Sequence, residues 1–359
     1  MPATSSLPIA MPIAGLKRWG CTAAVVLWSV VGLPAAISGE ASVAVQALAV
    51  TEINPGVFVH SGKLEDWGPD NGGDVANLGF VIGNRCVAVI DTGGTPAIGH
   101  ALRAAVERAT PLPICYVINT HAHPDHILGN VAFAKQPAGS TPVEFVASAA
   151  FAHTLAARQP YYLNALSRDF HIELDASGLV YPTVSVSEQQ PVELDLGGRT
   201  LKLRAWPTAH TDNDLTVFDE RTRTLFAGDL LFISHLPALD GSLRGWVDVT
   251  RDLARLDVAT VVPGHGSVSN AWPQAMHAQA TYLQGLLSDT RAAIADGWTI
   301  TEATERITPA AGSHWLLTDR FHKRNVTAAF AELEWEDSPP ASPATPTQPA
   351  ASRSHSTSH

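Results

Sequence analysis

The amino-acid sequence predicts an α/β fold in which mixed β-sheets are covered by helices. Two observations support this prediction. Short apolar runs come in pairs around glycine-containing turns, as the strands of hairpins do. Longer helical patterns follow these pairs, and the whole succession occurs twice along the chain, which is typical of sheets with helices outside. Because no repeat is visible residue by residue, we expect one domain, over residues 48–336.

The first half of this domain is predicted from its apolar runs and turn residues. Its strands are expected at residues 57–59, 75–82, 86–90, 114–118 and 143–146, with an amphipathic helix at 96–109. Residues 147–170 have a helical pattern that we expect to be broken at Pro160, because proline has no backbone N–H to donate. The weakly patterned segment 174–187 is predicted to be an insertion.

The second half follows the same alternation. Hairpins are expected because Gly197-Gly198 separates one pair of apolar runs and a polar turn separates the next pair. The expected strands are 192–196, 200–206, 215–218, 224–226 and 258–262, and the expected helices are 242–256, 273–295, 301–307 and 318–334.

The two ends of the chain have their own composition. Lys17 and Arg18 precede an apolar run and then small residues, which is the order of a secretory signal. We expect residues 1–47 to be removed on export, leaving a periplasmic or secreted protein with no stable membrane insertion; an uncleaved anchor is the alternative. Residues 337–359 are rich in Pro, Ser, Thr and Ala, and we expect them to be disordered.

Charge and cysteine content limit the remaining possibilities. The chain has 23 Lys and Arg against 34 Asp and Glu, a net charge of −11, which excludes the basic footprint that nucleic-acid binding needs. Export would leave Cys86 and Cys115, an even number that permits a disulfide. We favour two separate buried thiols, because disulfide geometry is narrow.

One stretch, residues 119–126, has the strongest functional signal. It contains His121, His123, Asp125 and His126, four potential metal ligands in six residues, directly after an apolar strand. Alternate residues at a strand end point the same way, so His121 and His123 can bind one ion together. Asp125 and His126 follow the turn into a helix and therefore suit a second ion.

Three later strands also end in potential ligands. These are His210 after Trp206, Asp229 after Gly228, and His265 between two glycines. Sites in folds of this kind collect where strands end. One such residue is usually only polar surface, but together with the first stretch they indicate a metal centre.

This order of motifs resembles the metallo-β-lactamase-fold superfamily. The resemblance covers nearly all of the chain after the signal segment and implies a four-layer αβ/βα sandwich. It implies that His121, His123 and His210 hold one metal, that Asp125, His126 and His265 hold another, and that Asp229 bridges them. Asp91 matches the family's aspartate beside the site, with the expected role of orienting a metal-binding loop or a ligand histidine.

The ligand types predict the chemistry. All donors are nitrogen or oxygen, so we expect two Zn²⁺ ions per chain, while iron or manganese also suits these ligands. A hydroxide shared by two ions is a nucleophile near neutral pH. We therefore expect a hydrolase of a small ester, lactone, thioester or amide, in which Asp125 and Asp229 contribute to catalysis as metal ligands.

Several segments resemble a narrower group, the quinoprotein relay system metallohydrolases. They are Asn71-Gly72-Gly73, Asn77-Leu78-Gly79-Phe80, residues 210–214, residues 236–246 and Arg324-Asn325-Val326-Thr327. This resemblance implies a periplasmic quinoprotein dehydrogenase as partner. A β-lactam hydrolase is an alternative, although in true β-lactamases the position of Asp229 is typically Cys or Ser. Two further alternatives are an iron-dependent redox protein such as a sulfur dioxygenase, and a non-catalytic partner of a dehydrogenase.

Four further residues are candidates for substrate contacts. His235 and Arg244 flank the loop that follows Asp229, which places them where a loop would overhang the site. Trp67, in the polar loop before Asp74, and Trp246 are expected to line the same cavity. A salt bridge within the loop, or a solvated surface, is the alternative for His235 and Arg244.

Overall fold

The computed structural model describes residues 45–135 and 141–336. The expected tail 337–359 lies outside the described residues, as does the expected signal segment except for residues 45–47. Among the residues that are described, no helix combines the length and the apolar composition needed to cross a membrane. The domain limits 48–336 remain a prediction.

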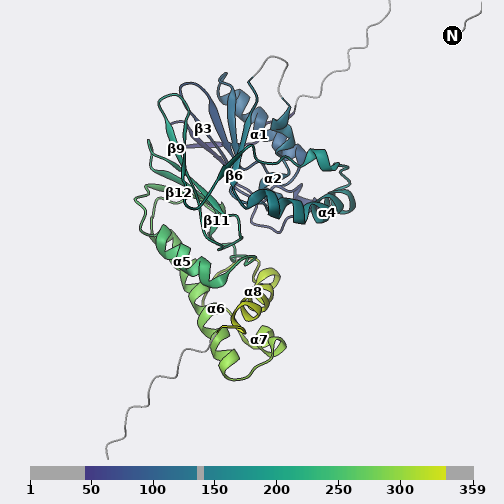
Figure 1. Cartoon of the computed structure of the whole chain (residues 1–359), viewed down its shortest axis with the longest axis vertical. Helices are drawn as coiled ribbons and strands as arrows, with labels where there is room; N and C mark the ends of the chain where they lie inside the picture. The colour runs from purple at the N-terminus through teal and green to yellow at the C-terminus, as the bar shows by residue number, and fades with distance from the viewer. Residues whose placement is uncertain (1–44, 136–140, 337–359) are drawn as a thin grey trace, which may run out of the picture. The chain divides into compact units, whose positions relative to one another are not determined.

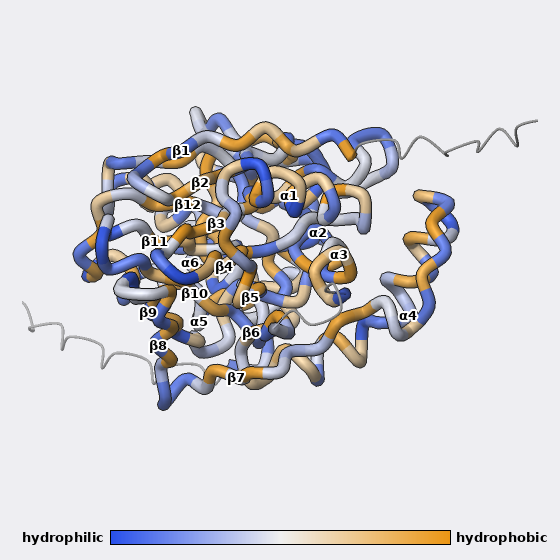
Figure 2. The backbone as a smooth tube through the Cα atoms, turned by 90° about the horizontal axis from the view of Figure 1, so that it is seen from above, coloured by the Kyte–Doolittle hydropathy of each residue, from blue (hydrophilic) through white to orange (hydrophobic). Residues whose placement is uncertain are grey.

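Two β-sheets form the centre of the structure (Figure 1). The first sheet has the order β1-β2-β3-β4-β5-β6-β7, and these strands follow one another across Figure 2. Strands β1 to β4 pair antiparallel, whereas β4 to β7 pair parallel. Their bounds are β1 (Thr51–Asn54), β2 (Val57–His60), β3 (Leu78–Ile82), β4 (Val87–Ile90), β5 (Ile114–Ile118), β6 (Glu144–Ser148) and β7 (Val184–Val186).

The second sheet has the order β12-β11-β10-β9-β8. Its strands are antiparallel except for the parallel pair β11 and β12. Their bounds are β8 (Val192–Asp195), β9 (Thr200–Ala205), β10 (Leu215–Asp219), β11 (Thr224–Phe232) and β12 (Thr260–His265).

Successive side chains along each strand point to opposite faces of the sheet, and this alternation explains the layered arrangement. Val57 and Val59 point between the sheets, where they meet apolar residues of the second sheet, while Phe58 packs on the opposite face. In β11, Phe226 points between the sheets and its neighbours Leu225 and Ala227 point to the outer face. Each sheet therefore has two apolar faces, and helices cover the outer ones.

The helices form the outer layers. On the first sheet lie α1 (Pro96–Ala109) and α3 (Val131–Ala134), and α4 (Phe151–Phe170) packs beside them on α2 (Pro124–Ile127). On the second sheet lie α5 (Leu243–Leu253), α6 (His277–Ala295), α7 (Ile300–Arg306) and α8 (Thr318–Leu333), which Figure 1 shows as one group. The predicted α/β class and four-layer αβ/βα sandwich are confirmed.

Local sequence explains where several helices begin. Thr95 accepts a hydrogen bond from the Ile98 N–H, and Pro96 occupies the first helical position, so α1 begins where predicted. Thr299 and Glu302 form a reciprocal capping box at the start of α7.

Several predicted elements differ from the structure: the predicted insertion 174–187 contains strand β7, and α4 and β11 depart from their predicted course. Helix α4 runs without a break through Pro160, so the predicted break is wrong. Its apolar side chains, among them Phe151, Leu155 and Leu166, pack on one buried cluster along the whole helix, and this packing offsets the one backbone hydrogen bond that proline cannot make. Strand β11 continues to Phe232, beyond the predicted end at residue 226, because β12 pairs with it.

The structure joins Cys86 and Cys115 in a disulfide. The favoured prediction of two separate thiols is therefore wrong. Cys86 directly precedes β4 and Cys115 lies in β5, and these strands are parallel neighbours with Val87 beside Ile114. The pairing brings the two Cα atoms to 5.8 Å, which is within the range that a disulfide needs.

Candidate metal centre

The predicted ligands meet at one edge of the two sheets. The loop after β5 carries His121 and His123, and α2 carries Asp125 and His126. From the second sheet, His210 lies between β9 and β10, Asp229 lies within β11, and His265 ends β12. Each residue lies at or near the end of a buried strand, so the ligand loops are anchored by the core.

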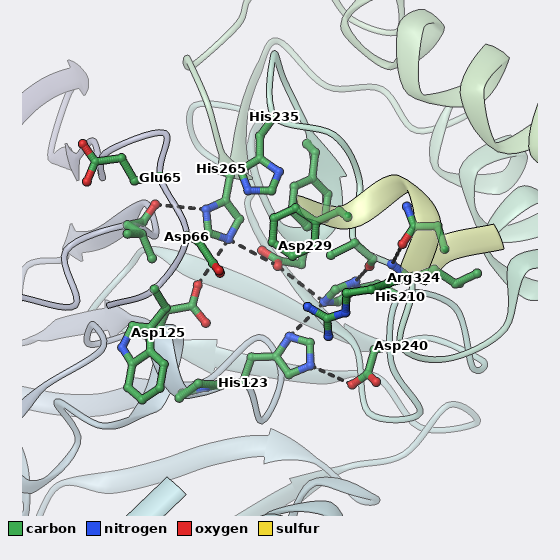
Figure 3. Close-up of a pocket in the computed structure, with 18 of the residues that line it drawn as sticks. Glu65, Asp66, His123, Asp125, His210, Asp229, His235, Asp240, His265 and Arg324 are labelled. Carbon is green, nitrogen blue, oxygen red and sulfur yellow. Dashed lines mark hydrogen bonds and ion pairs between the residues drawn. The ribbon is translucent and has the colours of Figure 1, made fainter. Parts of the chain in front are cut away.

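These seven side chains form two adjoining groups. Ligand atoms of His121, His123, His210 and Asp229 lie within 4.8 Å of one another, as do those of Asp125, His126 and His265. Asp229 faces both groups. Its Oδ2 lies 3.4 Å from His210 Nε2 and 3.4 Å from His265 Nε2, and its Oδ1 lies 3.2 Å from His126 Nε2. The sequence-based ligand set is thus brought together completely. Figure 3 labels those of its members that line the cavity, namely His123, Asp125, His210, Asp229 and His265.

The buried polar atoms of the cluster fit a metal centre. His121 Nε2, His126 Nε2 and Asp229 Oδ1 are buried and make no hydrogen bond. Buried polar atoms are nearly always hydrogen-bonded, so three such atoms pointing into one place require another partner. Nitrogen and oxygen donors in groups of three and four are the ligands of zinc and similar ions.

In each ligand histidine, the ring nitrogen that does not face the centre makes a hydrogen bond to another group, as is usual for metal-binding histidines. The partners are Asp91 for His126 (2.7 Å), Asp240 for His123 (2.9 Å), the Val75 carbonyl for His265 (2.9 Å), the Ala238 carbonyl for His210 (2.6 Å) and Thr120 Oγ1 for His121 (3.1 Å). These bonds direct the remaining nitrogen of every ring toward the centre.

Asp91 organises the loop that carries the first ligands. Its Oδ1 accepts from the Thr120 backbone N–H at 2.8 Å, and its Oδ2 accepts from Thr120 Oγ1 at 2.7 Å and from His126 Nδ1. Asp91 has a φ of 54°, in the left-handed region that aspartate adopts more readily than most residues. The carboxylate therefore touches both the loop and one ligand histidine.

Electrostatics divide the histidines into two kinds. Burial lowers the pKa of His121 well below its ordinary value and lowers that of His210 to about 4, so both are neutral, as ligands must be. Burial also opposes charge on His126 and His265, but Asp229 and Asp125 outweigh it. They raise the pKa of His265 to about 9 and that of His126 well above its usual value. The second group therefore attracts positive charge.

Two glycines are required for close packing at the centre. A Cβ at Gly264 would stand 1.8 Å from Asp229 Oδ1, and a Cβ at Gly228 would stand 2.6 Å from Thr120 Cβ. Gly228 also has a φ of 53°. These contacts explain why glycine precedes both Asp229 and His265, and why this signal was readable in the sequence.

A cavity of about 190 Å³ lies over the ligands. Of the residues predicted to contact substrate, His235 and Trp67 line this cavity. Arg244 does not line it, because its guanidinium pairs with Glu332 and Glu336. Trp246 does not line it either, since its buried indole N–H donates to the Leu230 carbonyl.

Sequence reasoning gave no site role to several residues of this cavity, among them Asp240, Arg158 and Arg324. Asp240 contacts His123, and Arg158 of α4 pairs with the same carboxylate. Arg324 lines the cavity from α8. The sequence contained only a weak signal for them: Asp240 and Arg324 lie in segments that resemble the quinoprotein relay system metallohydrolases, a resemblance that gives neither residue a role, and Arg158 looks like a charge on an exposed helix face.

Comparisons with known proteins agree with this geometry. A model of the metallo-β-lactamase superfamily matches residues 71–265, more than half of the chain. A metallo-β-lactamase from Pontibacter korlensis is similar in structure, with 22% identity over 66% of this chain and 99% of that chain and a TM-score of 0.53.

A stereoselective inverting sec-alkylsulfatase from Pseudomonas sp. is also similar, with 17% identity, a TM-score of 0.59 and coverage of 80% of this chain and 50% of that one. At these identities the two likenesses show the fold. A search of curated proteins gave no match.

Proposed function

The chain belongs to the metallo-β-lactamase superfamily, whose members are mostly hydrolytic metalloenzymes, and on that premise we propose that it is a dinuclear zinc-dependent hydrolase. Its substrate is a small ester, lactone, thioester or amide. One observation carries the proposal: seven nitrogen and oxygen ligands meet under a cavity, and three of their buried atoms make no hydrogen bond.

The residues present account for two ion sites. His121, His123 and His210 would hold one ion and Asp125, His126 and His265 the other, and Asp229, which faces both groups, would bridge them. When bound, two such ions supply an activated water and polarise the group that it attacks. Iron and manganese suit the same donors, and zinc is the proposal because histidine predominates among them.

The chain's own side chains prepare this chemistry. Asp91 and Asp240 hold His126 and His123 in fixed orientations, so no reorganisation is needed when substrate arrives. The cavity has an apolar wall around the ligands, formed by the aromatic side chains of Trp67, Phe232 and Phe321. His235 stacks between Phe232 and Phe321, with ring centroids 5.2 and 5.1 Å away, and limits the space above His265.

We also propose that the protein is exported and acts beside a periplasmic quinoprotein dehydrogenase. The charged, apolar and small-residue order of residues 1–47 supports export. The disulfide between Cys86 and Cys115 supports it independently, because disulfides persist mainly in oxidising compartments.

The test combines metal analysis with a hydrolysis screen. The purified protein is analysed for bound metals and assayed on esters, lactones, thioesters, amides and β-lactams. We expect about two zinc ions per chain and turnover of at least one of the first four classes. One ion or fewer after full metal loading, or hydrolysis of β-lactams alone, would overturn the proposal.

A further inference from the structure

The cavity over the metal ligands contains several charged side chains, and nearly all of them are paired within the protein. Asp66 pairs with Arg320, and Asp240 pairs with Arg158. Glu65 accepts a hydrogen bond from Asn71 at 3.1 Å. Within residues 45–135 and 141–336, the guanidinium of Arg324 has no ion pair and no hydrogen bond, although it lines the same cavity.

Two neighbours of Arg324 in α8 hold this part of the helix at the cavity. Asn325 accepts a hydrogen bond from the Leu239 N–H at 2.9 Å and donates to the Pro237 carbonyl at 2.6 Å, which fixes α8 to the loop beside the ligands. On the other side, Phe321 lies 5.1 Å from the His235 ring. The helix that carries Arg324 is therefore anchored to the site.

The guanidinium itself is free to bind a ligand. Among the residues that the structure describes, its one ring contact is with Phe321, whose centroid lies 5.6 Å from the Arg324 Cζ, and none of them accepts a hydrogen bond from its N–H donors. Figure 3 shows the side chain reaching from α8 toward the metal ligands. A planar guanidinium with free donors matches the two oxygens of a carboxylate.

The charge of the loaded site favours the same ligand. Two divalent ions would carry four positive charges, against two negative charges from Asp125 and Asp229. Of the other charged side chains of the cavity, Asp66 and Asp240 are paired with arginines, and Arg324 offsets the charge of Glu65, so the excess positive charge of the ions remains. A positive cavity with apolar walls concentrates small anions.

We propose that Arg324 binds a carboxylate of the substrate and makes the enzyme selective for small anionic substrates. This inference rests on the proposed hydrolase function, since it assigns the part of the substrate that does not react. The bond that is cleaved lies at the metal ligands, and the carboxylate lies toward α8.

The test uses two substrates that differ only in charge. Monophenyl succinate and its neutral methyl ester have the same phenyl leaving group, and kcat/KM is measured for both with the metal-loaded enzyme. We expect the wild type to prefer the anionic ester by about tenfold or more, and Arg324→Gln to abolish that preference by lowering kcat/KM for the anionic ester far more than for the neutral one. Arg324→Lys should restore part of it.

A matched control removes the same charge from the same helix. Lys323 is exposed and does not line the cavity, so Lys323→Gln should keep the preference of the wild type. Equal preference in wild type and Arg324→Gln, or an equal effect of Lys323→Gln, would overturn the proposal.

Binding of succinate separates this inference from the proposed function. By calorimetry, we expect Arg324→Gln to weaken succinate binding to the metal-loaded protein about tenfold. If no ester, lactone, thioester or amide is hydrolysed but this weakening occurs, the hydrolase proposal fails and the anion site stands. If both esters are hydrolysed and succinate binds equally to both proteins, the anion site fails.

Discussion

Asp240 orients the ligand histidine His123 and strengthens it as a metal ligand. It accepts a hydrogen bond from His123 Nε2 at 2.9 Å, which leaves Nδ1 as the ligand atom, 3.1 Å from His210 Nε2. Burial opposes charge on Asp240, but the hydrogen bond from His123 and the charge of Arg158 hold its pKa well below the ordinary range. The carboxylate is therefore ionised, and it makes the Nδ1 atom of His123 a stronger electron-pair donor to a metal ion.

Asp240→Asn removes this charge with little change of size. We expect the affinity of the first ion to fall by about tenfold to a hundredfold, as for other carboxylates behind a ligand histidine. Competition with a chelator of known affinity measures it. Asp66→Asn is the matched control, because Asp66 also lines the cavity and pairs with an arginine but contacts no ligand. Equal metal affinity in both variants would contradict the role of Asp240.

Asp229 is the residue on which the two-ion arrangement depends. Asp229→Asn keeps the size of the side chain and removes the negative charge that reduces the repulsion between the two ions. The second ion should therefore bind more weakly, and kcat should fall by roughly a hundredfold or more. Asp229→Cys should retain metal better than Asn, since a thiolate still serves the second ion. Metal content and kcat are measured together. Two ions and near-normal turnover in Asp229→Asn would show that Asp229 does not bridge.

Strands and helices fix the site through their ends, and this is the level at which sequence patterns worked best. Strand β5 and helix α1 begin and end at the predicted residues, because an apolar run before a polar loop and a Thr-Pro start are local signals. The same locality explains most of the ligands, which lie in or shortly after a strand that an apolar run predicts, whereas Asp125 and His126 lie on α2.

Contacts between distant segments were not predictable in this way. Pro160 is accepted inside α4 only because the helix packs on a buried cluster, and β11 extends past Asp229 only because β12 pairs with it. Arg158 and Arg324 reach the cavity from helices whose own patterns contain no sign of it. Arg244 was placed at the site by sequence proximity, but two glutamates of the C-terminal part bind it elsewhere.

The disulfide between β4 and β5 is a further element-scale feature with a measurable effect. It closes a loop with a sequence separation of 29 residues, and constraining a loop of this length in the unfolded chain stabilises the fold by about 3–4 kcal/mol. The double variant Cys86→Ala and Cys115→Ala should lose about this much in urea unfolding of the metal-loaded protein.

Reduced wild-type protein is the control for that measurement, because it keeps both side chains and loses only the covalent bond. We expect it to be destabilised nearly as much as the double variant. A loss below about 1 kcal/mol in the reduced protein would show that the disulfide contributes little to stability.

At the scale of the whole molecule, the two sheets bring together ligands with different charge states. The first sheet and its loops supply His121, His123, Asp125 and His126, and the second supplies His210, Asp229 and His265. His121 and His210, which are neutral, and His126 and His265, which the carboxylates keep protonated, all lie within 4 Å of the Asp229 carboxylate. The two ions should therefore bind with different pH dependence.

This difference gives a prediction with a definite sign. A metal ion binds only neutral imidazole, so a proton must leave any ligand histidine whose pKa lies above the ambient pH. At pH 7.5, His210 with a pKa of about 4 and His121, also lowered, have none to release. His265, with its pKa near 9, and His126, raised well above its ordinary value, each carry one.

His121 and His210 should therefore add no pH dependence to binding of the first ion between pH 7 and 9, while binding of the second should strengthen by up to about a hundredfold per pH unit, because His126 and His265 release two protons. Calorimetric titration of the metal-free protein with zinc, in two buffers of different ionisation enthalpy, counts those protons directly. We expect the second ion to release about two protons more than the first. Equal release in both steps would mean that Asp125 and Asp229 do not hold protons on His126 and His265, and the charge division between the two sites would be wrong.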